Sequence, residues 1–306
     1  MKPVNNYKLP NFIIVGAAKS GTTSVDQYLR QHPEVYMCPQ KEPYFFSFVN
    51  KKIDFKGPYD SIMKDVIVTD FNEYVSFFNN VTDQKAIGEC SNSYLFLTHS
   101  AEEIKKYIPD CKIIIILRDP VERAFSHYAQ HVMIGHEKLT FEEAIEQESY
   151  RKAAGWRWHY QYLEQSMYYK QVKVYYDIFP KENILVLFFD DLKKDPSLFM
   201  KEIFEFIGVS PMVEGIDFKV YNKTGMPKSR LLHNFLYSKK FFKKLLGFFI
   251  PEQFKIHIFK TIYELNMDYT AKPKLSEETR KKLKEYFKPD IKKLEQLLNK
   301  DLSNWY

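Results

Sequence analysis

The sequence is poor in glycine and cysteine, and it contains no long apolar run. Only 10 of its 306 residues are glycine, so two glycines close together stand out. The three cysteines, Cys38, Cys90 and Cys111, show neither CxxC nor metal-ligand spacing, which argues against a disulfide scaffold and a zinc site. We therefore expect no metal. With no run near 18 apolar residues and no signal-peptide core, we expect a cytoplasmic protein without an integral membrane segment, or a domain excised from a larger protein.

The excess of positive over negative charge is also small. The 45 Lys+Arg against 39 Asp+Glu leave a formal net charge of +6. This mild, dispersed excess excludes a dedicated nucleic-acid binder but suits an anionic ligand. Aromatic residues, in contrast, are abundant, with 26 Phe, 22 Tyr and 3 Trp. The 45% hydrophobic content indicates a globular chain.

Apolar runs and helical patterns alternate along the first two thirds of the chain. Four short runs predict buried parallel strands: 12–15, 85–88, 113–117 and 184–189. Three helices are predicted over 22–31, 121–135 and 161–179, and three more begin at Ser100-x-x-Glu103, Thr140-x-x-Glu143 and Asp195-Pro196. The alternation predicts an α/β fold with a central parallel sheet flanked by helices. We expect one domain over 1–306, with about 210–306 forming a mostly helical extension or lid without a clear strand.

A candidate phosphate loop follows the first predicted strand. Gly16-Ala17-Ala18-Lys19-Ser20-Gly21-Thr22-Thr23-Ser24 joins that strand to a helix, an arrangement whose backbone N–H groups and helix dipole favour an anion. A Walker A loop would carry its lysine directly after the second glycine, where this sequence has Thr22. The displaced lysine favours the 5′-phosphate end of a nucleotide over the β- and γ-phosphates of ATP.

These residues resemble the sulfotransferases that use 3′-phosphoadenosine 5′-phosphosulfate (PAPS). Lys19–Thr23 matches the family's 5′-phosphosulfate loop, and the run 114–128, Ile-Ile-Ile-Leu-Arg-Asp-Pro-Val-Glu-Arg-Ala-Phe-Ser-His-Tyr, matches its 3′-phosphate segment. The segment 41–46, Lys-Glu-Pro-Tyr-Phe-Phe, looks like that of the heparan-type branch. The closing Phe287-x-Pro289 region fits the same branch. The disulfide-free chain with a basic amphipathic segment is also similar to the cyanobacterial polyketide-synthase sulfotransferase domains.

The resemblance implies a P-loop-like fold and a set of site residues. It implies that PAPS binds without a metal and leaves as adenosine 3′,5′-bisphosphate. The implied cofactor-binding residues are Lys19, Ser20, Gly21, Thr22, Thr23, Ser24, Arg118 and Ser126, with Lys228, Ser229 and Arg230 from a later basic loop.

Sulfuryl transfer explains these residue types. Negative charge grows on the leaving phosphate oxygen, and a lysine at the loop, Lys19, stabilises it. The acceptor hydroxyl loses a proton, for which Glu42 is the first candidate base and His99 the reserve. A surface ion pair between Lys41 and Glu42 is the structural alternative for Glu42.

Two further features leave their roles open. Apolar residues recur with helical period over 231–250, with lysines on another face, which predicts a packed helix, a lid, a membrane-surface helix or a docking surface for an acceptor carrier. The aromatic cluster around Trp156, Trp158, His159, Tyr160 and Tyr162 fits either an acceptor cleft or the core.

The sequence thus predicts a sulfotransferase acting on an acceptor hydroxyl of a carbohydrate, lipid or carrier-bound chain, without nucleic acid as a partner. The alternative functions are a P-loop nucleotide or small-molecule kinase that uses Mg-ATP, and a non-catalytic nucleotide-binding module.

Overall fold

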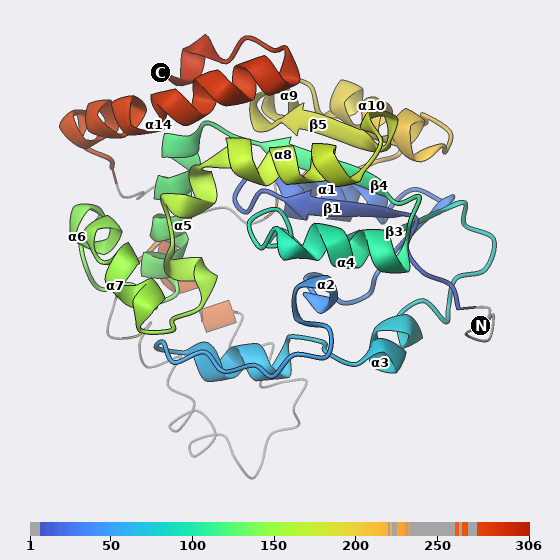
Figure 1. The fold of residues 1–306 in the computed structure, drawn as a ribbon, viewed down its shortest axis with the longest axis horizontal. Coiled ribbons are helices and arrows are strands. Elements are labelled where there is room, and N and C mark those ends of the chain that lie inside the picture. The colour runs from blue at the N-terminus through green and yellow to red at the C-terminus, as the bar shows by residue number, and fades with distance from the viewer. Residues whose placement is uncertain are drawn as a thin grey trace.

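The computed structural model describes residues 7–219, 221, 225–229, 232, 261–262, 265–268 and 274–306. Its central feature is a five-stranded parallel sheet in the order β2-β3-β1-β4-β5 (Figure 1). The strands are β1 Phe12–Gly16, β2 Val35–Met37, β3 Ala86–Cys90, β4 Lys112–Leu117 and β5 Ile184–Phe188. The predicted parallel sheet is therefore confirmed, and β1 and β4, whose apolar residues are all buried, pair in its middle.

Helices cover both faces of the sheet because its central strands are apolar on both sides. The helices are α1 Thr22–Leu29, α2 Phe45–Phe48, α3 Phe71–Ser76, α4 His99–Tyr107, α5 Pro120–Met133, α6 Phe141–Glu146, α7 Glu148–Ala153, α8 Tyr168–Ile178, α9 Phe189–Lys194, α10 Pro196–Ile207 and α14 Glu277–Leu298. Figure 1 shows α4 and α8 in front of the sheet and α1 behind it. Short 3₁₀ turns are η1 Asp60–Asp65, η2 Trp158–Tyr160, η3 Glu164–Ser166, η4 Lys181–Asn183 and η5 Ser303–Trp305.

Alternate residues of β1 and β4 belong to two separate cores. Ile13 and Ile115 pack with α4, α8 and α14, whereas Ile14 and Ile114 pack with α1 and α10. All four side chains are fully buried. This burial fixes the register of the central strands and therefore the position of the loops at their carboxyl ends.

Two helix starts follow their predicted chemistry. Thr140 and Glu143 form a capping box at α6, and the Asp195 side chain accepts from the Leu198 N–H, with Pro196 at the first position of α10. The capping box at Ser100 was wrong. The helix α4 begins one residue earlier, and the Ser100 hydroxyl donates to the Leu97 carbonyl at 2.7 Å.

The predicted helix over 161–179 is also wrong in its first third, since α8 begins only at Tyr168. The Tyr162 carbonyl accepts from the Arg123 guanidinium and the Ser166 hydroxyl, which compete with a helical hydrogen bond.

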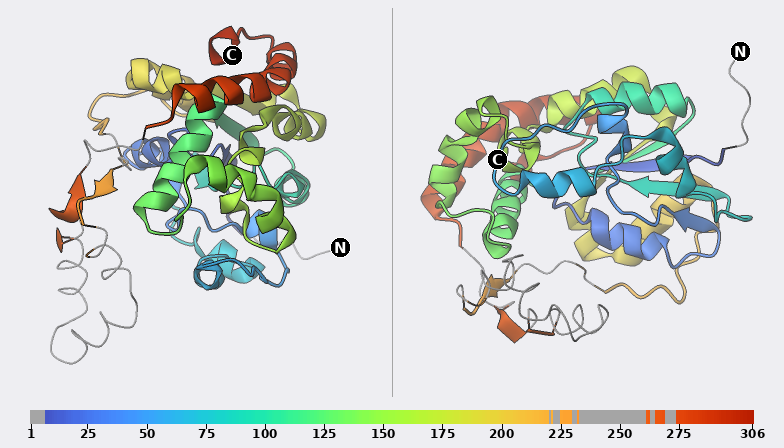
Figure 2. Two further views of the ribbon diagram at one scale, coloured as in Figure 1. Left: turned by 90° about the vertical axis from the view of Figure 1, so that its left-hand side faces the viewer. Right: turned by 90° about the horizontal axis from the view of Figure 1, so that it is seen from below.

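Two strand predictions needed correction. The sequence missed β2, which has only three residues between Pro33 and Pro39. The region after 210, expected to lack strands, contains the antiparallel pair β6 Met226–Pro227 and β7 Met267–Asp268, outside the main sheet (Figure 2). In the same region α14 packs against α8 and α5. The predicted segment 231–250 lies outside the described residues, apart from Leu232.

No helix in the described part of the chain is both long and apolar enough to cross a membrane.

Candidate active site

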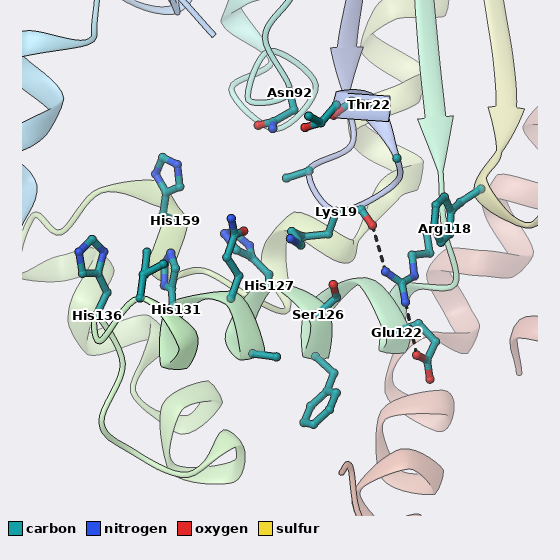
Figure 3. Close-up of a pocket in the computed structure, with 18 of the residues that line it drawn as sticks. Lys19, Thr22, Asn92, Arg118, Glu122, Ser126, His127, His131, His136 and His159 are labelled. Carbon is teal, nitrogen blue, oxygen red and sulfur yellow. Dashed lines mark hydrogen bonds and ion pairs between the residues drawn. The ribbon is translucent and has the colours of Figure 1, made fainter. Parts of the chain in front are cut away.

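A cavity of about 1170 Å³ opens at the carboxyl ends of β1, β3 and β4. Each strand delivers one part of its wall: the loop after Gly16, Asn92 after β3, and Arg118 directly after β4 (Figure 3). The helix α5 forms another wall. Open parallel sheets bind ligands at this edge, so the site lies where the sheet predicts it.

The loop between β1 and α1 turns at Gly21. This residue has φ +87°, and an added Cβ would lie 2.7 Å from Leu192 Cδ2 and 2.9 Å from Phe189 Cδ2. Glycine is therefore required by both conformation and space. No side chain caps the N-terminus of α1 at Gly21, and the first-turn residues line the cavity, so this helix end favours an anion there.

Two side chains of this loop lack partners among the described residues. Lys19, with φ +69°, lines the cavity, and no hydrogen bond or ion pair occupies its Nζ. Burial, reinforced by the neighbouring Arg118 charge, lowers the pKa of Lys19 to about 8. The Ser20 hydroxyl is fully buried and also unpaired, although Ser20 is not on the cavity wall.

Arg118 and Ser126 lie on the same cavity as the loop. The Arg118 guanidinium donates to the Lys19 carbonyl at 3.1 Å, lies 3.6 Å from the Glu122 carboxylate and stacks over the Phe189 ring at 4.9 Å. Ser126 lies on α5, with its hydroxyl toward Lys19 and Arg118 (Figure 3). The structure thus brings together the two segments whose roles the resemblance assigned to opposite ends of one nucleotide.

The Glu42 carboxylate also lines the cavity. It accepts from Lys41 Nζ and Asn92 Nδ2, each at 2.5 Å, and from the Tyr44 hydroxyl. Burial alone would raise the pKa of Glu42, but the Lys41 charge and these donors hold it below its ordinary value. The alternative ion pair with Lys41 therefore exists, but at the cavity wall rather than on the open surface.

A buried carboxylate supports the segment that carries Glu42. Glu89 on β3 accepts from Tyr74 and Ser91 hydroxyls, each at 2.6 Å. The Ser91 hydroxyl in turn accepts from the Tyr44 N–H at 3.4 Å. Glu42 and Tyr44 both have positive φ, 62° and 58°, so this network holds a backbone conformation that is rare outside glycine.

Sequence reasoning missed several cavity residues. Asn92, which binds Glu42, follows the weakest of the predicted strands, and the rule of strand carboxyl ends could have identified it. Four histidines also line the wall: His127, His131 and His136, which the sequence did not single out, and His159, which belongs to the predicted aromatic cluster. The spacing of His127 and His131, one helical turn apart, was the available signal.

Other predicted site residues lie elsewhere. The described cavity wall does not include His99, whose Nε2 lies 2.9 Å from the Ser47 carbonyl. Lys228 Nζ donates to the Leu265 carbonyl and the Ser229 N–H to Asn266, so the structure brings neither to the wall. Arg230 lies outside the described residues. Thr22, Thr23 and Ser24, like Gly21, line the cavity as expected.

The aromatic cluster divides between core and cavity. Trp158, Tyr160 and Tyr162 are at most 4% exposed and pack inside, and Trp156 lies beside the Arg151 guanidinium. Only His159 of this cluster contributes to the cavity wall.

The donor set fits a nucleotide with phosphates at two positions. Lys19 and the N-terminus of α1, which no side chain caps, lie at one end, and Arg118 with Ser126 offers donors at the other. Among the described residues, no group of three or more His, Cys, Asp or Glu side chains is arranged to hold a metal ion.

Known proteins match this chain over its sequence and its fold. A solved sulfotransferase from Alicyclobacillus acidocaldarius is 32% identical, with a TM-score of 0.75, and the alignment covers 97% of this chain and 99% of that one. The membrane-associated sulfotransferase kil1 of Dictyostelium discoideum is 36% identical over 121 residues, covering 39% of this chain and 22% of kil1.

A human bifunctional heparan sulfate N-deacetylase/N-sulfotransferase 3 is 28% identical over 218 residues, covering 67% of this chain and 23% of that protein. The chain thus spans less than a quarter of the length of these two curated relatives. The sulfotransferase domain model matches residues 9–300. This match covers both the phosphate loop and the Arg118 segment, and it confirms the resemblance: the chain belongs to the sulfotransferase domain family.

Proposed function

We propose that this enzyme transfers the sulfuryl group of PAPS to an acceptor hydroxyl, with Lys19 stabilising the leaving phosphate and Glu42 acting as the base. The observation that carries the proposal is that a partnerless Lys19 ammonium and an ionised Glu42 carboxylate lie on one cavity. When bound, PAPS supplies a sulfuryl group attached to a phosphate that can leave.

The phosphate loop would hold the 5′ end of the nucleotide. Backbone N–H groups at the start of α1 would be its donors, and Lys19 Nζ adds positive charge where negative charge develops. Ser20, which does not line the wall, stays a candidate. Arg118 and Ser126 would hold the 3′-phosphate, because a guanidinium can bind phosphate with two parallel hydrogen bonds. Lys228, Ser229 and Arg230 stay candidates for a closing loop.

Glu42 would accept the proton of the attacking hydroxyl. Lys41 and Asn92 both bind Oε1, and the Tyr44 hydroxyl binds Oε2, so the carboxylate is fixed in orientation and kept ionised. The same hydrogen bonds limit the basicity of Glu42. We therefore expect the proton to move late in the reaction, when the acceptor oxygen has become acidic through its forming bond to sulfur.

The proposal extends to the setting of the enzyme. We infer one sulfotransferase domain over residues 1–306, because the two cores share a single sheet. A cytoplasmic location and an acceptor on a carbohydrate, lipid or carrier-bound chain remain parts of the proposal.

Calorimetric titration of the full chain tests the proposal against the kinase alternative. We expect adenosine 3′,5′-bisphosphate to bind without a metal, and ATP with Mg²⁺ to bind at least tenfold more weakly, because Thr22 stands where a Walker lysine is needed. Tight Mg-ATP binding together with no bisphosphate binding would overturn the proposal. The Lys19→Ala variant, with its fold checked by circular dichroism, should weaken bisphosphate binding.

A further inference from the structure

Four imidazoles line the part of the cavity that continues beyond Lys19. His127 and His131 lie one turn apart on α5, His136 lies in the loop that follows, and His159 lies in η2. Figure 3 shows the first three in a row that leads away from Lys19, with His159 beside them. His127 and His131 are each only 3% exposed. The transfer chemistry derived above uses none of the four.

The protein partners of two rings fix which nitrogen carries the proton. An Arg123 guanidinium nitrogen lies 3.4 Å from His127 Nδ1, and an Arg157 guanidinium nitrogen lies 3.2 Å from His136 Nδ1. A guanidinium can only donate, so both Nδ1 atoms accept. Each ring then carries its proton on Nε2, for which no partner exists among the described residues, so each cavity-lining ring has an Nε2–H left to donate.

His131 has the opposite arrangement. The Tyr162 hydroxyl donates its proton to the Glu137 carboxylate at 3.0 Å. His131 Nδ1 lies 3.1 Å from the Tyr162 hydroxyl oxygen, which can then only accept, so His131 Nδ1 must donate. His131 Nε2 is therefore an acceptor. His159 Nδ1 is buried and has no partner in the described part of the chain. Donors and acceptors thus alternate along one wall.

Two cationic side chains near the imidazoles are already paired, and Lys19, at the end of the row, is the lysine proposed above to serve the leaving phosphate. The Arg157 guanidinium pairs with the Asp60 carboxylate at 3.4 Å and donates to the Tyr59 carbonyl. Lys41 is occupied by Glu42. The imidazoles are neutral at pH 7, because burial, with neighbouring positive charges, lowers the pKa of His159 to about 3, that of His136 to about 4, and those of His127 and His131 well below their ordinary value.

We propose that the histidine wall (His127, His131, His136 and His159) is the acceptor subsite and selects an uncharged acceptor with several hydroxyl groups, such as a neutral saccharide. Each hydroxyl is both donor and acceptor, so neighbouring hydroxyls can satisfy an alternating wall. A carboxylated or sulfated acceptor would meet neutral imidazoles and compete with the leaving phosphate for the Lys19 ammonium. This inference rests on the proposed sulfuryl transfer and specifies its substrate.

Matched acceptors test the charge selection. Sulfate transfer from ³⁵S-labelled PAPS is measured with neutral tetrasaccharides of glucose, galactose and N-acetylglucosamine, with their C6-carboxylate counterparts, and with a long-chain alcohol. We expect at least one neutral tetrasaccharide to be sulfated with kcat/KM more than tenfold above its carboxylate counterpart and above the alcohol. A preference for the carboxylate or the alcohol overturns the inference.

The acceptor assay and the calorimetric titration together separate the two proposals. Bisphosphate binding without sulfation of any neutral tetrasaccharide overturns the acceptor inference and leaves the cofactor site standing. Absence of bisphosphate binding overturns both.

Variants of His131 test the wall directly. His131→Leu should raise the KM for the best neutral acceptor about tenfold through loss of one hydrogen bond, with bisphosphate affinity unchanged. His131→Gln retains an amide acceptor and should recover part of this loss. The matched control is His32→Gln, since His32 is equally buried but lies against Ser210 and Phe204, away from the cavity. Equal KM values in all four proteins overturn the inference.

NMR of the histidine nitrogens tests the inference without measuring catalysis. In the ¹⁵N-histidine-labelled full chain loaded with bisphosphate, we expect His127 and His136 protonated on Nε2 and His131 on Nδ1. Addition of the neutral tetrasaccharide should shift these signals. Different tautomers, or no shift at saturating saccharide, overturn the inference even if the His131 variants fail to fold.

Discussion

At the scale of single residues, Glu42 combines a tight ion pair with a place on the cavity wall. Glu42→Gln keeps the shape and an oxygen for Lys41 and Asn92, but the amide cannot take a proton. We expect kcat to fall about 10²- to 10⁴-fold, the range for loss of a general base, with an unchanged fold. Steady-state kinetics and circular dichroism measure both.

The matched variant for this prediction is His99→Asn. Since His99 lies against the Ser47 carbonyl and off the described cavity wall, its kcat should stay within about twofold of the parent. The reverse pattern, an active Glu42→Gln and an inactive His99→Asn, would transfer the role of base to His99.

Some residues of the site could be read from the sequence and others could not. Arg118 was predictable because it directly follows an apolar strand, and Lys19 because it lies in the short glycine-flanked loop after another, so both positions need only local geometry. His136 and His159 reach the wall from segments 23 residues apart in sequence, held by Arg157, Asp60 and Tyr59. Such a tertiary arrangement leaves no local pattern.

At the scale of elements, the phosphate loop packs closely against α9 at Gly21. An added methyl group would meet Leu192 and Phe189, and Phe189 supports the Arg118 guanidinium. We expect Gly21→Ala to lower the free energy of unfolding by about 2–4 kcal/mol, from the left-handed conformation and the overlap together, and to weaken bisphosphate binding. Urea unfolding and calorimetry measure the two effects.

Gly208→Ala is the control for the cost of the left-handed backbone conformation alone. Gly208 caps α10 with a similar φ of +83°, but an added Cβ would meet only the flexible end of Lys112 at 3.7 Å. Gly208→Ala should cost about 1 kcal/mol and leave ligand binding intact. Equal costs for the two variants would show that the contact with α9 contributes nothing.

Elements were predictable where apolar runs were long and helix caps were local. The central strands and the starts of α6 and α10 follow from composition and from Thr140, Glu143 and Asp195. The sequence analysis missed β2 because three residues give too short a pattern. It began α8 too early because the Arg123 guanidinium, 39 residues away, hydrogen-bonds the Tyr162 carbonyl. A short pattern caused the first error, and a long-range hydrogen bond caused the second.

At the scale of the whole molecule, the cavity collects loops from three strands together with α5 and the start of α14. A ligand that contacts several of these segments stabilises the folded chain. Bisphosphate at about 100 times its Kd should add about 2.7 kcal/mol and raise Tm by roughly 5 °C. Differential scanning calorimetry measures this shift.

The control for the thermal shift is adenosine 5′-monophosphate, which lacks the 3′-phosphate. It should raise Tm by less at the same concentration, and Arg118→Ala should remove the difference between the two ligands. Equal shifts with both nucleotides in the parent protein would contradict the assignment of Arg118 to the 3′-phosphate.

The lowered pKa of Lys19 has a consequence for covalent chemistry. At pH 8 about half of this side chain is the neutral, nucleophilic amine, whereas the exposed Lys173, whose pKa is raised by hydrogen bonding to Asp177, stays protonated. Trace acetylation with acetic anhydride followed by peptide mass spectrometry should therefore modify Lys19 ahead of Lys173, and bisphosphate should protect Lys19 alone of the two. The lysine suited to a leaving phosphate is thereby a selective attachment point for an amine-reactive nucleotide probe.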